Sequence, residues 1–153
     1  MIERISAFAI VSLALNPSMV WTASELGVAC ELHGDGLSSE ASLTRVAPDG
    51  TRLDSGTLVS ENGFYIEFPS LAWTGSVYGV AWGQLSLWNS AIYLAVVSAD
   101  GNEVGPPMKI SESDWTIYAK MPSLAWTGSE FGVAWYDERS GSQELYFARV
   151  GCP

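Results

Sequence analysis

Short apolar runs separated by polar turns follow one another along the whole chain. Residues 131–136 (FGVAWY) and 144–150 (ELYFARV) are apolar over most of their length rather than alternating, which predicts strands buried on both faces. Asp49-Gly50 and Asp100-Gly101 separate apolar runs, and this pair indicates a hairpin because Gly readily takes the positive φ of the turn. The pattern predicts strands throughout and no helix.

The chain repeats itself at intervals of about 50 residues. The segment 122–135 (PSLAWTGSEFGVAW) nearly duplicates 69–82 (PSLAWTGSVYGVAW), and a more divergent copy occupies 17–30 (PSMVWTASELGVAC). Self-similarity at this period indicates a repeat architecture in which each copy is one supersecondary unit. Bulky residues that recur in register within apolar strands are typical of packing positions, which predicts that the repeated Trp residues are core: Trp73, Trp82, Trp126 and Trp135.

The two ends of the chain are out of phase with these repeats. Ile5-Ser6 stands at the same distance before Pro17 as Ile110-Ser111 stands before Pro122. Residues 2–16 are therefore predicted to be the last strand and linker of a unit, whereas the chain ends after the third strand of another. We expect one repeat domain over 1–153, with repeat 1 at 17–68, repeat 2 at 69–121, and repeat 3 at 122–153 completed by the N-terminal strand 2–16.

The repeat unit resembles β-propeller blade repeats found in uncharacterised bacterial proteins. The resemblance covers nearly the whole chain and rests on P-S-L-A-W-T-G-S-x-F/Y-G-V-A-W, a following hairpin, an L-Y-F-A-R-V strand and an Asp-Gly turn. Repeat 1 departs from it, with Cys30 where Trp82 and Trp135 stand. The resemblance implies an all-β fold of three four-stranded blades. A β-trefoil monomer is the alternative, although no Gln-x-Trp signature is present.

Counting blades predicts a homodimer. Closed propellers usually have about four to eight blades, so one chain cannot close alone, two supply six blades, and three would supply nine. We expect a two-fold dimer forming a six-bladed ring, in which each N-terminal strand around Ile5 pairs with the third unit of the partner. This pairing would cover strand edges that otherwise invite aggregation.

Composition excludes several classes of partner and site. Seven Lys and Arg against 17 Asp and Glu give a net charge of −10, which argues against nucleic-acid and membrane partners. Two cysteines, Cys30 and Cys152, and one histidine, His33, are too few for a disulfide framework or a structural zinc site, so no metal or cofactor is expected. His33 lies in a polar run and is predicted to be a solvated surface residue.

The N-terminal apolar stretch 5–15 has the length of a signal-peptide core. Glu3 and Arg4 cancel in the region that should be positive, and a cut after Ala23 would place Trp21 where a small residue is needed. We expect no cleavage here, which slightly favours a cytoplasmic location.

Candidate ligand contacts fall in two places. In the polar hairpin of repeat 3, Tyr136, Asp137 and Arg139 flank a Gly-containing turn and could bind a sugar hydroxyl or a carboxylate. The alternative is that Asp137 caps its own turn and Arg139 lies on the surface. Trp88 and Trp115 lie outside the repeated framework in polar surroundings, where exposed rings could stack on a sugar or cover the rim between blades.

These features predict a non-enzymatic binding or scaffold module that pairs with itself and with a glycan or a protein, or a lectin-like carbohydrate-binding propeller. The hairpin is loosely similar to the aspartate-box turns of sialidase-like propellers, but the Ser-x-Asp-x-Gly-x-x-Trp form is absent. Asp137 and Glu138 are adjacent, which does not place them on opposite sides of a glycosidic bond. A glycosidase is therefore the less favoured interpretation.

Overall fold

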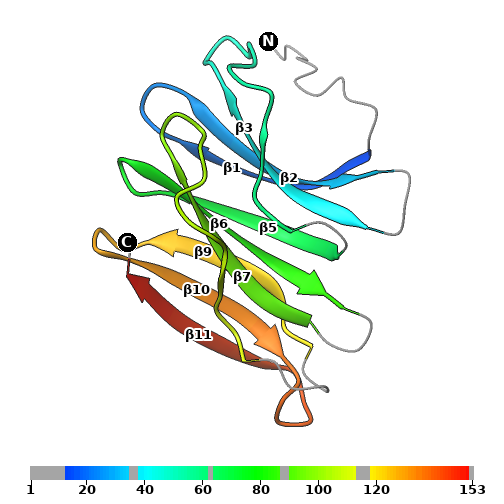
Figure 1. The fold of residues 1–153 in the computed structure, drawn as a ribbon. Coiled ribbons are helices and arrows are strands. Elements are labelled where there is room, and N and C mark those ends of the chain that lie inside the picture. The colour runs from blue at the N-terminus through cyan, green and yellow to red at the C-terminus, as the bar shows by residue number, and fades with distance from the viewer. Residues whose placement is uncertain (1–12, 35–37, 62–63, 87–89, 113–117, 152–153) are drawn as a thin grey trace, which may run out of the picture.

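The computed structural model describes residues 13–34, 38–61, 64–86, 90–112 and 118–151, which form three antiparallel sheets and no helix (Figure 1). We call the sheets blade 1, blade 2 and blade 3, and each follows the strand order of the chain. Blade 1 contains β1 (Leu13–Trp21), β2 (Leu26–His33), β3 (Ser39–Val46) and β4 (Thr57–Leu58). Blade 2 contains β5 (Tyr65–Trp73), β6 (Val77–Leu85), β7 (Ser90–Ser98) and β8 (Met108–Lys109), and blade 3 contains β9 (Lys120–Trp126), β10 (Glu130–Asp137) and β11 (Glu144–Gly151).

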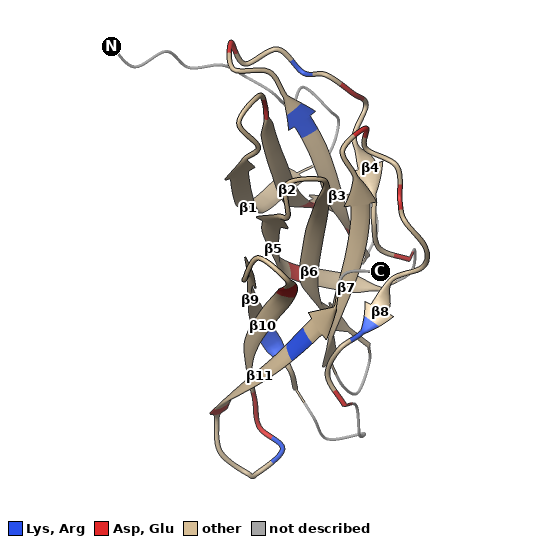
Figure 2. Cartoon of the chain, turned by 90° about the vertical axis from the view of Figure 1, so that its left-hand side faces the viewer, with Lys and Arg blue, Asp and Glu red and all other residues tan. Residues whose placement is uncertain are grey.

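The blades stack face to face in chain order, and the repeated Pro-Ser pair lies in the first strand of each blade. Strand β5 packs against both β1 and β9, and these three inner strands follow one another along one edge of the stack (Figure 2). The predicted all-β fold of blade-like repeats is confirmed. The trefoil alternative is not supported, because the strands form separate stacked sheets.

Two buried clusters lie between the blades. One joins blades 1 and 2 and contains Trp82, and the other joins blades 2 and 3 and contains Trp135. The predicted core positions of these two rings are confirmed, whereas Trp73 and Trp126 on the inner strands are only partly buried against the same clusters. The repeats therefore mark packing positions correctly but do not show how deeply each ring is buried.

Glycine on the second strand of a blade sets the spacing to the next blade. A Cβ atom added to Gly27 would lie 2.5 Å from Cε1 of Tyr78, and one added to Gly79 would lie 2.5 Å from Cε1 of Phe131. Tyr78 and Phe131 occupy the same repeat position, one blade further along. Each aromatic ring therefore packs directly against the backbone of the preceding blade, which requires glycine there.

The inner strands are also joined by a repeated hydrogen bond. The backbone N–H of Leu71 donates to Oγ of Ser18 at 3.0 Å, and the N–H of Leu124 donates to Oγ of Ser70 at 2.9 Å. Both serines follow the repeated proline. The same two residue positions therefore join blade 1 to blade 2 and blade 2 to blade 3.

A buried phenol links blades 1 and 2 through an ion pair. The hydroxyl of Tyr78 donates to Oε1 of Glu25 at 2.8 Å, and Nε of Arg45 donates to the same oxygen at 2.6 Å. The hydrogen bond from Arg45 lowers the pKa of Glu25 despite partial burial. Burial, followed by the hydrogen bond to Glu25, raises the pKa of Tyr78 well above its ordinary value.

Replacing Tyr78 with phenylalanine is expected to lower the free energy of unfolding by about 1–2 kcal/mol, since one charge-assisted hydrogen bond is lost while the ring remains. Because the pKa of Tyr78 is raised on folding, its contribution is full below the ordinary tyrosine pKa of about 10 and declines as the pH rises above it. Urea unfolding between neutral and alkaline pH should show a weaker alkaline decline for Tyr78→Phe than for the wild type. Equal stability at neutral pH would contradict the prediction.

Residues 2–12 of the predicted N-terminal strand and linker lie outside the described residues. Residues 13–16 of the predicted linker belong to β1, the inner strand of blade 1. Among the described residues, no helix is long and apolar enough to cross a membrane.

Candidate functional site

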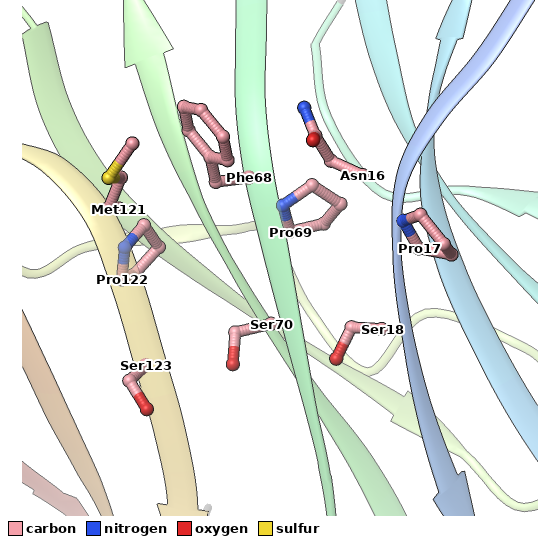
Figure 3. Close-up of a pocket in the computed structure, with 9 residues that line it drawn as sticks. All are labelled: Asn16, Pro17, Ser18, Phe68, Pro69, Ser70, Met121, Pro122 and Ser123. Carbon is pink, nitrogen blue, oxygen red and sulfur yellow. The ribbon is translucent and has the colours of Figure 1, made fainter.

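A pocket of about 400 Å³ lies across the inner strands of the three blades (Figure 3). Each inner strand contributes the same three consecutive repeat positions: Asn16-Pro17-Ser18 from β1, Phe68-Pro69-Ser70 from β5 and Met121-Pro122-Ser123 from β9. Figure 3 shows the prolines in one row, the serines in a second row, and Asn16, Phe68 and Met121 in a third. We call this the axial pocket, because it follows the edge at which the blades meet.

The residue before each repeated proline has a left-handed backbone. The φ angles of Asn16, Phe68 and Met121 are 50°, 51° and 52°. Each lies where the register of the inner strand shifts, as at a β-bulge, and none is glycine. A non-glycine residue in this conformation costs roughly 1–3 kcal/mol, and such strain is concentrated at ligand-binding sites. Strain at the same position of three blades marks the axial pocket as a candidate functional site.

One buried carboxylate ties two walls of the pocket together. Oε1 of Glu31 accepts hydrogen bonds from Nδ2 of Asn16 and from the backbone N–H of Phe68, both at 2.6 Å. Its other oxygen, Oε2, lies 3.2 Å from Nε2 of His33. Glu31 lies at the repeat position of Gly83 and Tyr136, so this carboxylate belongs to blade 1 alone among the three copies.

His33 differs from the sequence-based expectation. Its side chain is 15% exposed, lies beside Glu31, and makes an edge-on contact with the ring of Tyr65, with centroids 5.4 Å apart. The prediction of a solvated surface residue is therefore wrong. Tyr65 begins the inner strand of the next blade, a contact that the local polar sequence around His33 could not indicate.

The lining of the pocket combines hydroxyl groups with apolar surface. The hydroxyls of Ser18 and Ser70 accept backbone N–H groups and keep their own hydrogens to donate. Phe68, Met121 and the prolines supply the apolar part, and no carboxylate lines the pocket directly. This arrangement suits a small ligand that carries both hydroxyl groups and apolar C–H faces.

The predicted hairpin residues of blade 3 form a separate cluster. Oδ2 of the fully buried Asp137 accepts from Nε1 of Trp135 at 3.1 Å, and Oδ1 accepts from the backbone N–H and Nε of Arg139 at 3.2 and 2.9 Å. The guanidinium lies 4.2 Å above the ring of Tyr146 and 3.1 Å from a carboxylate oxygen of Glu112.

Asp137 is ionised and its oxygens are occupied within the blade. Burial alone would raise the pKa of Asp137, but hydrogen bonds from the side chain and backbone of Arg139 and from Trp135 outweigh it and lower the pKa. Tyr136 is half-buried in β10, opposite Leu145 and Lys120. None of these three predicted residues lines the axial pocket. Trp88 and Trp115 lie outside the described residues, and a ligand role for the set stays a prediction.

Metal-ligating and thiol groups are sparse in the part of the chain that the structure describes. Its residues contain no group of three or more His, Cys, Asp or Glu that could hold a metal ion. Cys30 is buried and free. Burial, followed by the charge of Glu31, raises the pKa of its thiol, which makes it a poor nucleophile.

No protein-family model matches this chain, and no curated protein matches it. Solved structures do. An α-L-arabinofuranosidase from Lactobacillus brevis matches with a TM-score of 0.61 and 10% identity, over 96% of this chain and 55% of that one. A thermostable family-43 glycoside hydrolase matches with a TM-score of 0.61 and 12% identity, over 96% and 57%. Trypanosoma rangeli sialidase in complex with sialic acid matches with a TM-score of 0.55 and 12% identity, over 91% and 30%.

The fold is that of a β-propeller. The chain spans about half the length of the first two structures and about a third of the sialidase. The sequence predicted a non-enzymatic binding or scaffold module, with a lectin-like propeller as the alternative. The comparisons contradict that prediction, because the matching propellers are glycoside hydrolases and sialidases. The glycosidase interpretation ranked last because the sequence shows no pair of carboxylates placed on opposite sides of a glycosidic bond.

Proposed function

We propose that this chain supplies three blades of a propeller that hydrolyses glycosidic bonds, with the sugar bound in the axial pocket. The observation that carries the proposal is the axial pocket itself, in which three strained pre-proline residues surround a hydroxyl-lined and apolar cavity. The likeness of the fold to arabinan-acting hydrolases and sialidases supports the same class of reaction. A sugar ring offers hydroxyls to Ser18, Ser70 and Ser123 and C–H faces to Phe68 and Met121.

Glycoside hydrolysis generally needs two carboxylates, one acting as acid and the other as base or nucleophile. Glu31 is our first candidate: it is buried directly behind the pocket wall, where its Oε1 bonds Asn16 and Phe68, and a sugar that displaces the side chain of Asn16 would contact it. Glu67 is our second candidate. It is half-buried, and it directly precedes Phe68 at the bulge of β5.

The repeat itself supports a finer assignment. We propose that these units belong with the blade repeats of uncharacterised bacterial propellers. The basis is the Pro-Ser pair and the Gly-Val-Ala run, since the serine joins neighbouring blades and the glycine accepts the aromatic ring of the next blade.

Purified protein should release sugar from at least one of three substrates: an aryl α-L-arabinofuranoside, linear arabinan and an aryl sialoside. Glu31→Gln keeps an oxygen that can accept hydrogen bonds from Asn16 and Phe68, so the fold should be retained. Because the variant has no ionisable carboxyl group at this position, kcat/KM should fall at least about a hundredfold. Glu103→Gln, an exposed carboxylate on blade 2, is the matched control and should leave activity unchanged. A folded protein inactive on all three substrates would contradict the proposal, as would full activity in Glu31→Gln.

A further inference from the structure

The outer face of blade 1 exposes a position that is buried in the other blades. Met19 is 63% exposed, whereas its repeat equivalents Leu71 and Leu124 are 7% and 8% exposed. Leu71 belongs to the cluster between blades 1 and 2, and Leu124 to the cluster between blades 2 and 3. Each equivalent therefore packs against the preceding blade. Met19 occupies the same position on a face that none of the three described blades covers.

The opposite end of the stack shows the complementary pattern. Phe147 on blade 3 is 62% exposed, whereas its equivalents Leu43 and Leu94 are 1% and 0% exposed. Leu43 and Leu94 belong to the clusters that each join their own blade to the following blade. Large apolar side chains that are exposed here but buried in their repeat equivalents mark an interface. The stack thus ends in two different faces, one shaped for a preceding blade and one for a following blade.

The repeated contacts show which residues would meet if these two faces joined. Gly27 and Gly79 each accept the aromatic ring of the next blade. The third glycine in the series is Gly132, whose added Cβ would approach only the ring of Phe147, at 3.1 Å, and its neighbours in blade 3. In blade 1 the repeat position of Tyr78 and Phe131 is held by Leu26, which is half-buried. Leu26 is therefore the side chain shaped for the position above Gly132.

The hydrogen bond between inner strands gives the same register independently. Ser18 and Ser70 accept from the following blade, and the third serine of the series, Ser123, is exposed and accepts no backbone N–H from another described blade. Its counterpart donor would be the N–H of Met19, which stands at the position of Leu71 and Leu124. The packing of a side chain on glycine and the hydrogen bond between inner strands therefore predict the same alignment of blade 3 with blade 1.

We propose that two copies of this chain assemble head to tail, with blade 1 of each copy seated on blade 3 of the other. Leu26 packs over Gly132 of the partner, and the N–H of Met19 donates to Ser123 of the partner. The two joints are equivalent by two-fold symmetry, so the contact closes instead of propagating. Six blades fall within the usual range of closed propellers, about four to eight. The assembly places six Pro-Ser pairs around one axis, and it does not depend on the catalytic proposal.

Sedimentation velocity of the full chain at micromolar concentration and physiological salt should give twice the chain mass of 16.5 kDa. Gly132→Leu should raise the dimer dissociation constant at least about tenfold, because the added side chain occupies the position of Leu26. Its own fold should persist, since Phe147 is exposed and its ring can move. Gly34→Leu is the matched control, because an added Cβ there meets nothing within 4 Å, and it should remain a dimer.

Mixing provides a second test that does not rely on loss of assembly. In a mixed dimer of Gly132→Leu and Leu26→Ala chains, one joint carries both changes and the other carries neither. The mixture should therefore form dimers more tightly than Gly132→Leu alone, with both partners present. A monomeric wild type, open-ended polymers, unchanged affinity in folded Gly132→Leu, or no gain on mixing would each overturn the proposal.

Discussion

Replacing Trp82 with alanine is expected to lower the free energy of unfolding by about 3–5 kcal/mol. The ring is fully buried between blades 1 and 2, stacks on Tyr93 with centroids 6.1 Å apart, and donates from Nε1 to Oε1 of Gln84 at 3.3 Å. Its removal leaves a large cavity and takes one hydrogen bond from the amide oxygen of Gln84. Urea unfolding followed by far-UV circular dichroism measures the change.

Trp73→Ala is the matched comparison for this experiment. Trp73 is a ring of the same size in the same cluster, but it is only partly buried. Its removal should therefore cost less than the removal of Trp82. A loss below about 1 kcal/mol for Trp82→Ala, or a larger loss for Trp73→Ala, would contradict the assignment of Trp82 to the core.

Asp137→Ala is expected to cost about 3 kcal/mol, because it leaves the buried indole N–H of Trp135 without an acceptor and Arg139 without its main partner. The pKa of Asp137 is lowered on folding, so its contribution is present above the ordinary aspartate pKa and is lost as the pH falls below it. The acid-induced loss of stability should be smaller in the variant than in the wild type.

The neighbouring exposed residue provides the control. Glu138→Ala removes one carboxylate from the same hairpin, where Oε1 accepts a hydrogen bond from the side chain of Gln143 at 3.1 Å. We expect a change within about 0.5 kcal/mol, as for most surface substitutions. If Asp137→Ala were as stable as Glu138→Ala, the hydrogen bonds from Trp135 and Arg139 to Asp137 would not stabilise the fold, and the carboxylate would be available to a ligand.

The number of blades and their packing positions could be predicted because they are repeated. The Pro-Ser pairs at three regular positions mark three inner strands, and the register of the Trp residues marks the core. The depth of burial could not be predicted, since Trp73 and Trp82 belong to one repeat and differ in exposure. Depth depends on the neighbouring blade, about 50 residues away in the sequence.

The candidate pocket was missed for a different physical reason. The left-handed positions are Asn16, Phe68 and Met121, three side chains with nothing in common, and no glycine indicates their backbone conformation. The available signal was the proline that follows each of them. Glu31 likewise gave a weak signal, a carboxylate inside an apolar strand where the other copies have Gly83 and Tyr136. Its partners, Asn16 and Phe68, come from two different blades and are not apparent from the sequence.

The strict pairing of each strand with its neighbours in sequence has a consequence for how the chain folds. Within a blade every ladder closes a short loop, so little chain entropy is lost before the first contacts form. Blades then couple only to the blades beside them, and stability becomes a sum of blade terms and nearest-neighbour terms. Blade 2 is held from both sides, whereas the end blades of a single chain are held from one. Unfolding should therefore begin at blades 1 and 3 and progress to blade 2. Unfolding is most cooperative when the blades form a closed ring, because every blade then has a neighbour on both sides.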